Sequence, residues 1–264
     1  MSETQQQSSG SEKIKKGEHT LIGHLTELRD RLLRSVLTVI VIFASLAYFA
    51  NDLYDILSEP MLKHFPEGSQ MIATGIITPF FTPYKLTMVL SLFLAMPIIL
   101  NQIWQFIAPG LYQNEKRLVA PLLFSSIFLF YGGIAFAYFV LFPLALAFLS
   151  SAGPESITHM PDIAEYLDFT LTIFFAFGVA FQIPIAVVLM IWTGMTTVET
   201  LREKRPYVVL GAFVVGMFLT PPDIFSQVFL AVPMWLLYEA GMIFSGFIKP
   251  KTKKIESDEE ESSE

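Results

Sequence analysis

The chain has 264 residues, of which 53% are hydrophobic and 16% are charged, and its mean hydropathy is +0.55. Soluble domains carry about 45–50% apolar and about 25% charged residues, and the apolar excess here is gathered in long blocks, so the composition excludes an ordinary soluble domain and indicates membrane spans. Cysteine is absent, which excludes disulfides, a thiol nucleophile and cysteine-based metal sites.

The N-terminal region is polar at first and then amphipathic. Residues 1–18 lack the apolar core and cleavage site of a signal peptide, so we expect a disordered cytoplasmic tail. The stretch HLTELRDRLLRS at 24–35 predicts an amphipathic helix that lies at the membrane surface before the first span. Within it, Glu27 and Arg31 are four residues apart and can pair. Either Glu27 only neutralises Arg31, or its carboxylate also contacts a cationic ligand.

Six apolar blocks predict six membrane-spanning helices, at about 32–49, 86–107, 118–142, 169–192, 207–220 and 226–247. The fifth block is short, because its helix would rise only about 21 Å against a hydrocarbon core of about 30 Å. That length predicts local thinning of the bilayer.

Prolines lie inside or at the edges of these blocks, at Pro97, Pro121, Pro143, Pro184 and Pro233. Each removes a backbone donor and is expected to bend its helix. We therefore predict an all-α polytopic membrane domain over 19–248, a bent and concave bundle, followed by a charged tail over 249–264.

The basic residues predict the orientation. Fifteen of the 17 lysines and arginines lie in the N-terminal region, in the loops after the second and fourth blocks, and in the C-terminal tail. The other side keeps only Lys63 and Lys85. Since cytoplasmic loops are enriched in lysine and arginine, both termini are expected to be cytoplasmic.

Catalytic motifs are missing from the sequence. It contains no metalloprotease, nucleophile-elbow or phosphate-loop motif, and its four histidines are isolated. We therefore expect neither an enzyme nor a metal or other cofactor. Any energy input must come from a partner or from the membrane potential.

A second carboxylate is expected at the cytoplasmic surface. The loop FIAPGLYQNEKR at 106–117 places Glu115 beside apolar residues and a basic pair. Glu115 either pairs with a neighbouring basic residue or, together with Glu27, suits a ligand with paired guanidinium groups followed by a hydrophobic segment. Arginine binds carboxylates bidentately, and lysine does not reproduce that geometry.

Two polar residues are predicted inside the membrane. Glu239 is either a structural carboxyl that faces another helix or a functional group, and Gln182 can bond to a neighbouring helix, including one from another protein. A small-molecule or ion transporter is the alternative class for a six-span bundle. It would need a polar site at the midplane and often internal repeats, and we find few such groups and no repeat.

Several stretches together resemble one family: HLTELRDRLL, FFTPYKL, QFIAPGLYQNEKR, FAYFVLFPLA and KRPYVVLGAFVVGMFLTPPD. The chain resembles the TatC family, the multi-spanning subunits of twin-arginine protein translocases, from about residue 20 to about residue 248. The resemblance points to a proteobacterial member.

The resemblance implies a function in protein export. TatC-like proteins lie in the bacterial inner membrane and bind twin-arginine signal peptides at its cytoplasmic face. They assemble with single-span partners of the TatA and TatB types into a multimeric complex. That complex exports folded proteins with the proton-motive force, without a cofactor and without a nucleic acid partner.

The resemblance also implies roles for individual residues. The signal-peptide-binding patch would contain Glu27, Arg29, Phe106, Leu111, Glu115, Lys116 and Arg117. Two positions on the periplasmic side would be functionally sensitive, Pro60 and Asp223. Contacts with a partner helix would involve Gln182, Met217, Thr220 and Gln227. Many members carry glutamate where this chain has Gln182, which keeps hydrogen bonding but loses protonation.

Overall fold

The computed structural model describes residues 3–62, 72–107, 116–145, 147, 162–219 and 224–246. These residues confirm the predicted all-α class, since their only strand-like feature is one bridge between Ile72 and Asp162. The helical elements are α1 (Glu3–Leu46), η1 (Ala47–Phe49), α2 (Ala50–Leu62), α3 (Thr78–Ile107), α4 (Lys116–Phe136), η4 (Ala137–Leu141), α6 (Ile163–Ala180), α7 (Ile183–Trp192), α8 (Val198–Glu203), α9 (Arg205–Leu219) and α10 (Ile224–Ser245).

Five helical segments among the described residues are long and apolar enough to cross a membrane: Leu25–Ser58, Thr78–Ile107, Val119–Ala145, Ile163–Trp192 and Gln227–Ser245. The apolar helix α9 has 15 residues and rises about 22 Å, which is less than the roughly 30 Å of a hydrocarbon core. In chain order, these six segments correspond to the six predicted blocks.

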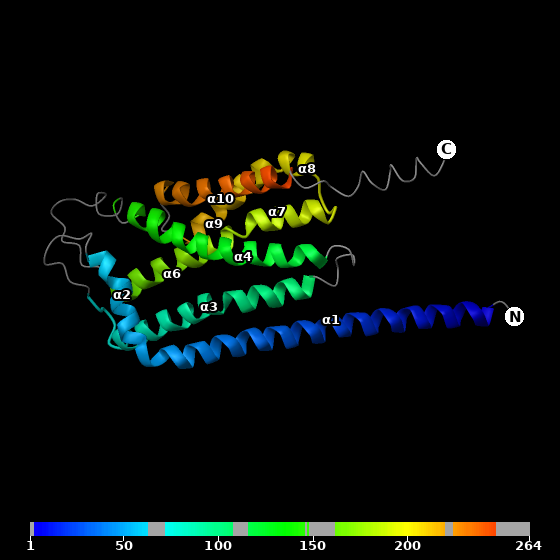
Figure 1. The fold of residues 1–264 in the computed structure, drawn as a ribbon, viewed down its shortest axis with the longest axis horizontal. Helices are drawn as coiled ribbons and strands as arrows, with labels where there is room; N and C mark the ends of the chain where they lie inside the picture. The colour runs from blue at the N-terminus through cyan, green and yellow to red at the C-terminus, as the bar shows by residue number, and fades with distance from the viewer. Residues whose placement is uncertain are drawn as a thin grey trace.

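The long helices lie side by side, and α2 crosses the bundle at one end (Figure 1). The opposite end holds the end of α3, the start of α4, the α8–α9 junction and the end of α10. We call this the basic end, because it contains Lys116, Arg117, Arg202, Lys204 and Arg205. Arg31 of α1 reaches the same end, since it contacts Gln105 near the end of α3.

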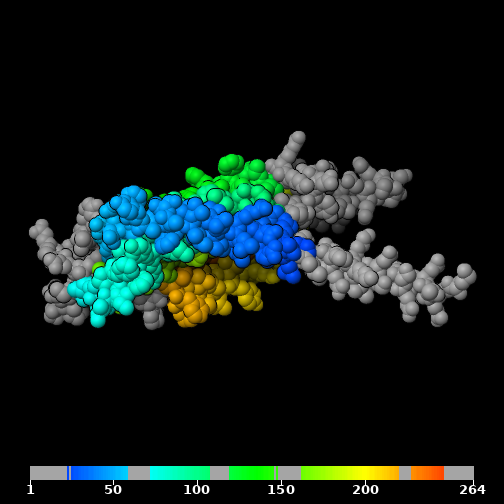
Figure 2. Space-filling view, turned by 90° about the horizontal axis from the view of Figure 1, so that it is seen from below, coloured from blue at the N-terminus to red at the C-terminus, as the bar shows by residue number. Residues whose placement is uncertain are grey.

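The first helix is longer than the sequence predicts. α1 runs without interruption from Glu3 to Leu46, through residues 3–18, which the sequence predicts as a disordered tail, and through the amphipathic stretch 24–35. No proline precedes residue 60, and each residue added to an existing helix gains a backbone hydrogen bond. Figure 2 shows α1 lying across the surface of the bundle, where it packs mainly on α3.

Pro184 interrupts the fourth predicted span. α6 ends at Ala180 and α7 begins at Ile183, with Pro184 in its first turn. Proline has no N–H for the carbonyl four residues earlier, and its ring crowds that carbonyl. The predicted block 169–192 is therefore two helices, interrupted just before this proline.

The other prolines act differently. Pro143 follows the π-helical segment η4, in which the Phe142 N–H bonds to the Ala137 carbonyl and so widens the turn before the proline. Pro97, Pro121 and Pro233 lie inside helices that continue past them.

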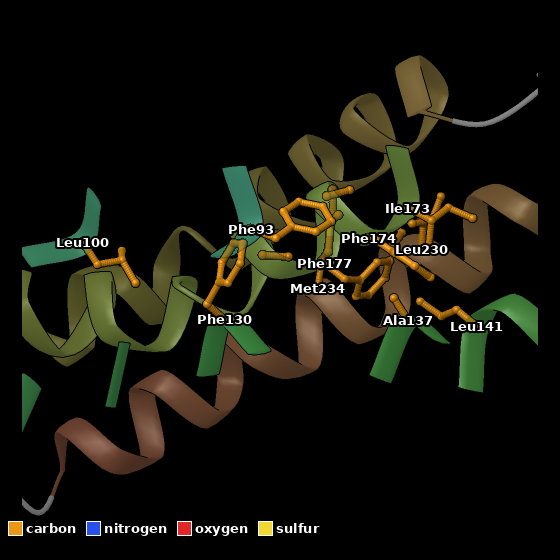
Figure 3. Close-up of a cluster of buried hydrophobic side chains, with 14 residues drawn as sticks. Phe93, Leu100, Phe130, Ala137, Leu141, Ile173, Phe174, Phe177, Leu230 and Met234 are labelled. Carbon is orange, nitrogen blue, oxygen red and sulfur yellow. The ribbon is translucent and has the colours of Figure 1, made fainter. Parts of the chain in front are cut away.

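The core gathers side chains from α3, α4, α6 and α10, including Phe93, Phe130, Phe177 and Met234 (Figure 3). Two glycines let α4 and α6 approach closely. A Cβ atom on Gly133 would lie 2.4 Å from the Phe177 carbonyl oxygen, and one on Gly178 would lie 2.6 Å from the Phe130 ring. Small residues at such crossings are typical of helix packing in membranes.

The end of the bundle crossed by α2 is tied together by Asp162, the N-cap residue of α6. Thr74 donates its N–H and its hydroxyl to Oδ2, each at 2.8 Å, and Ala164 and Glu165 donate N–H groups to Oδ1. The Thr74 N–H and then its hydroxyl have the largest effects, and with the α6 N–H groups they outweigh desolvation and lower the pKa of Asp162 to about 2.

We expect Asp162→Ala to lower the free energy of unfolding by about 0.5–2 kcal/mol, the usual effect of losing an N-cap. The depressed pKa makes this contribution fully present above the ordinary aspartate pKa of about 3.9, and it is lost as the pH falls toward 2. Thermal unfolding of both proteins in detergent between pH 7 and pH 2 measures the difference. A gap that stays constant down to pH 2 would contradict this account.

Candidate functional site

A carboxylate at the basic end holds a guanidinium group from its own helix. Arg31 donates from Nε to Glu27 Oε1 at 3.0 Å and from Nη2 to the same oxygen at 2.5 Å. The i,i+4 pairing predicted from the spacing is therefore confirmed. The side chain of Glu27 is 34% exposed and that of Arg31 is 16% exposed, so the carboxylate is the more accessible partner.

Arg31 also joins α1 to the end of α3. Its Nη1 donates to Gln105 Oε1 at 2.9 Å and lies 3.4 Å from Gln102 Oε1, and its Nη2 lies 3.3 Å from the Gln105 carbonyl oxygen. Gln105 is held in turn by Asn101, whose Oδ1 accepts from its amide at 3.1 Å. We call Glu27, Arg31, Gln102 and Gln105 the Glu27 cluster.

The structure describes the side chains of only some of the other residues predicted for signal-peptide binding. Arg29 is exposed and pairs with its neighbour Asp30 rather than with Glu27. Phe106 is exposed and directly follows Gln105 at the end of α3. Lys116 and Arg117 begin α4 at the same end, but their side chains, like Leu111 and Glu115, lie outside the described part of the chain.

Glu239 forms an ion pair with Arg205, from α10 to the start of α9. Arg205 Nη2 donates to Glu239 Oε2 at 2.6 Å, and the two side chains are 41% and 19% exposed. Glu239 Oε1 and Arg205 Nε are buried and have no hydrogen-bond partner within the described residues. The sequence leaves Glu239 as either a structural carboxyl that faces another helix or a functional group, and it assigns Arg205 only to orientation. α9 and α10 are consecutive and antiparallel, so the start of α9 lies beside the end of α10. Arg205 and Glu239 are similarly far along the chain from the connection between the two helices, and this spacing could have indicated the pair.

Gln182 lies at the break between α6 and α7 and donates its amide to the Ser126 carbonyl of α4 at 2.9 Å. The Ser126 hydroxyl accepts from Trp104 Nε1 of α3 at 3.1 Å. Ser126 therefore joins three parts of the bundle, and the sequence analysis missed both it and Trp104. Serine and tryptophan inside apolar blocks were the available signal, because buried polar groups need partners.

Of the remaining positions, predicted for partner contact or for periplasmic function, the structure describes only some side chains. Gln227 donates to the Phe213 carbonyl at 2.7 Å and so joins α10 to α9, whereas Met217 is exposed on α9. Thr220 and Asp223 lie outside the described residues, and so does the side chain of Pro60, which belongs to α2. In the ranges that the structure describes, no group of three His, Cys, Asp or Glu side chains could hold a metal ion.

These features define an all-helical, multi-pass type of membrane protein with a carboxylate–guanidinium cluster at its basic end. Residues 23–233 match the family model described as Sec-independent protein translocase protein (TatC). The chain belongs to the TatC family.

Relatives and solved structures agree with this assignment. The chain is 58% identical over 238 residues to a Sec-independent protein translocase protein TatC from Azotobacter chroococcum, covering 90% of this chain and 93% of that protein. It is 57% identical over 236 residues to the TatC of Escherichia coli K12, covering 89% and 92%. A crystal structure of a twin arginine translocase receptor, TatC, superimposes with a TM-score of 0.77 at 38% identity, over 85% of this chain and 98% of that one.

We expect Arg205→Met to destabilise the fold more than the double change Arg205→Met with Glu239→Gln. The single change leaves a mostly buried carboxylate without its cation, at a cost of about 1–3 kcal/mol, and the second change removes that charge. Thermal unfolding of the two single variants and the double variant gives the coupling energy. Additive effects would show that the pair contributes nothing.

Proposed function

We propose that this chain is the receptor subunit of a twin-arginine translocase and that it binds signal peptides at its basic end. The observation that carries the proposal is the Glu27 carboxylate, which already holds one guanidinium group at an accessible surface. Glu115 would supply the second carboxylate for a paired-arginine ligand. Arg29, Phe106, Leu111, Lys116 and Arg117 would complete the patch, with Phe106 and Leu111 facing the hydrophobic part of the signal peptide.

The proposal includes a topology and a location. Six spans, with α9 as the short fifth, would place the basic end and both termini in the cytoplasm of a bacterium, at its inner membrane. The end of α10 and Arg31 of the N-terminal region lie at the same end of the bundle, which supports this orientation. The end tied by Asp162 would face the periplasm, together with Pro60 and Asp223.

The proposal also includes partners. Single-span subunits of the TatA and TatB types would assemble with this chain into a multimeric complex that exports folded proteins with the proton-motive force. Met217, with exposed neighbours such as Phe218, supports a helix-docking face on α9. Gln182, Thr220 and Gln227 would contribute to the partner contact, Gln182 and Gln227 through amide oxygens, since their amide nitrogens donate within the chain.

We expect Glu27→Gln and Glu115→Gln each to weaken the binding of an Arg-Arg precursor about 10- to 100-fold, since a hydrogen bond to a charged group is worth about 1.5–3 kcal/mol. The measurement is precursor binding to membrane vesicles, with photocrosslinking from position 114, which leaves Glu115 in place. The crosslink should be lost with a Lys-Lys precursor. Glu203→Gln is the matched control, because it removes an equal charge from an exposed carboxylate of α8 that lies outside the proposed patch. Equal crosslinks with both precursors would contradict bidentate recognition.

We expect a photocrosslinker at Met217 to capture a single-span partner subunit in membranes. The control position is Phe128, an exposed apolar residue of α4, which should capture mainly lipid. Mass spectrometry of the adducts identifies the captured chain. Equal capture from both positions would show that α9 is no preferred docking face.

A further inference from the structure

An apolar pocket lies at the end of the bundle that α2 crosses. It has a volume of about 310 Å³, and α2, α3, the α4–η4 segment and α6 all contribute to its walls. Nine of its ten lining side chains are leucine, isoleucine or phenylalanine, and the tenth is Tyr138. Ile56 of α2 lines the pocket and is exposed, so the pocket reaches the surface of the molecule. The volume is at the lower end of the range of ligand pockets, about 300–1,000 Å³.

We propose that this pocket binds one acyl chain of a phospholipid with an ethanolamine headgroup, and that Lys85 and Asp168 bind the phosphate and the ammonium of that headgroup. This inference concerns the opposite end of the bundle from the Glu27 cluster and does not depend on the proposed binding of signal peptides.

The two charges form an ion pair between α3 and α6. Lys85 Nζ lies 2.5 Å from Asp168 Oδ1, and the two side chains are 56% and 50% exposed. Each charge lies within one helical turn of the pocket lining, since Lys85 directly precedes Leu86 and Asp168 precedes Leu171 by three residues. An exposed pair of this kind contributes little to stability. Both partners are therefore available for exchange with outside charges of opposite sign.

The position of the pair along the helices matches the depth of a phospholipid headgroup. α3 and the segment Ile163–Trp192 each have 30 residues and extend about 45 Å, which is about 7 Å beyond a 30 Å hydrocarbon core at each end. Lys85 lies about 10 Å from the start of α3, and Asp168 lies about 8 Å from the start of α6. Both charges are therefore near the boundary of the core, and a lysine side chain can extend from there toward the headgroups.

The pocket continues from that level into the apolar part of the bundle. Leu90 and Phe93 line it five and eight residues after Lys85, which places them about 8 and 12 Å deeper along α3. A lipid whose phosphate contacts Lys85 would therefore extend its acyl chain along these side chains. A partner helix fits less well, because it is about 10–12 Å across and needs a groove along the surface rather than a pocket bounded by four elements.

The pair selects the headgroup by the contacts that each lipid returns to the two charges. The phosphate of any phospholipid accepts from Lys85, so the cost of opening the pair and the gain of this contact are common to all of them. An ethanolamine ammonium also donates to Asp168. A choline headgroup is charged but has no N–H, and a glycerol headgroup has hydroxyl donors but no positive charge, so neither gives Asp168 a charged donor.

The test is native mass spectrometry of the full-length chain in detergent, titrated with phosphatidylethanolamine, phosphatidylglycerol or phosphatidylcholine of identical acyl chains. We expect one phosphatidylethanolamine to bind about three- to tenfold more tightly than either other lipid, the effect of one partly exposed charge-assisted contact. Asp168→Asn should remove this preference. Glu199→Gln should keep it, because it removes an equal charge from an exposed residue of α8 at the basic end.

A second set of variants tests the pocket. Leu90→Trp fills it from within, and we expect it to weaken the binding of all three lipids at least about tenfold, the loss of about two buried methylene groups. Ile56→Trp should act in the same direction from an exposed position, and it decides the question if Leu90→Trp does not fold. Leu94→Trp is the matched control, since Leu94 is exposed on the next turn of α3 and does not line the pocket.

Each set of variants can overturn the proposal. Equal affinities of the three lipids for the original chain, or a preference that Asp168→Asn leaves intact, would show that the pair does not recognise the headgroup. Lipid binding that stays the same in Leu90→Trp, Ile56→Trp and Leu94→Trp would show only nonspecific lipid around the bundle. If the two pocket variants leave lipid binding unchanged and dissociate copies of the chain, the pocket holds part of a second copy, and the lipid site is wrong.

Discussion

Polar side chains inside an apolar bundle need hydrogen-bond partners within protein, because a bilayer offers no water to satisfy them. Trp104 and Gln182 both bond to Ser126, and Gln227 bonds to the backbone of Phe213. Each of these bonds joins helices that are separate in the sequence. The geometry of these bonds therefore constrains how the helices can be arranged, in addition to the shape of the apolar core. Because these polar groups already bond within the chain, few described polar groups remain to bind a transported solute.

The sequence predicts the parts of the fold that depend on local properties. Block hydropathy locates the long helices, and Pro184 locates the break between α6 and α7, because both signals act over a few residues. The helix α2 is not predicted, since its place depends on distant contacts such as the bond from the Tyr166 hydroxyl to the Leu57 carbonyl. The start of α3 at Thr78 is also missed, because Lys85 breaks the apolar run and its partner, Asp168, lies on α6.

The same limit applies to the candidate site. The pair of Glu27 and Arg31 follows from i,i+4 spacing, because the helix brings the two side chains together. The bonds from Arg31 to Gln105, 74 residues away, and from Arg205 to Glu239, 34 residues away, do not follow from any local pattern. They depend on which helices pack together, and a polar residue near a helix end has several possible neighbours before the packing is known.

One side chain connects the carboxylate proposed for ligand binding to the packing of the helices. Arg31 donates to Glu27 on α1 and to Gln105 on α3, the main neighbour of α1. The arrangement requires arginine. The planar guanidinium directs separate N–H groups toward two helices, whereas a lysine ammonium has one nitrogen and cannot span both in that geometry. A lysine at position 31 would keep the charge and the orientation of the helix in the membrane. It would not bond to Glu27 and to Gln105 at the same time in this geometry.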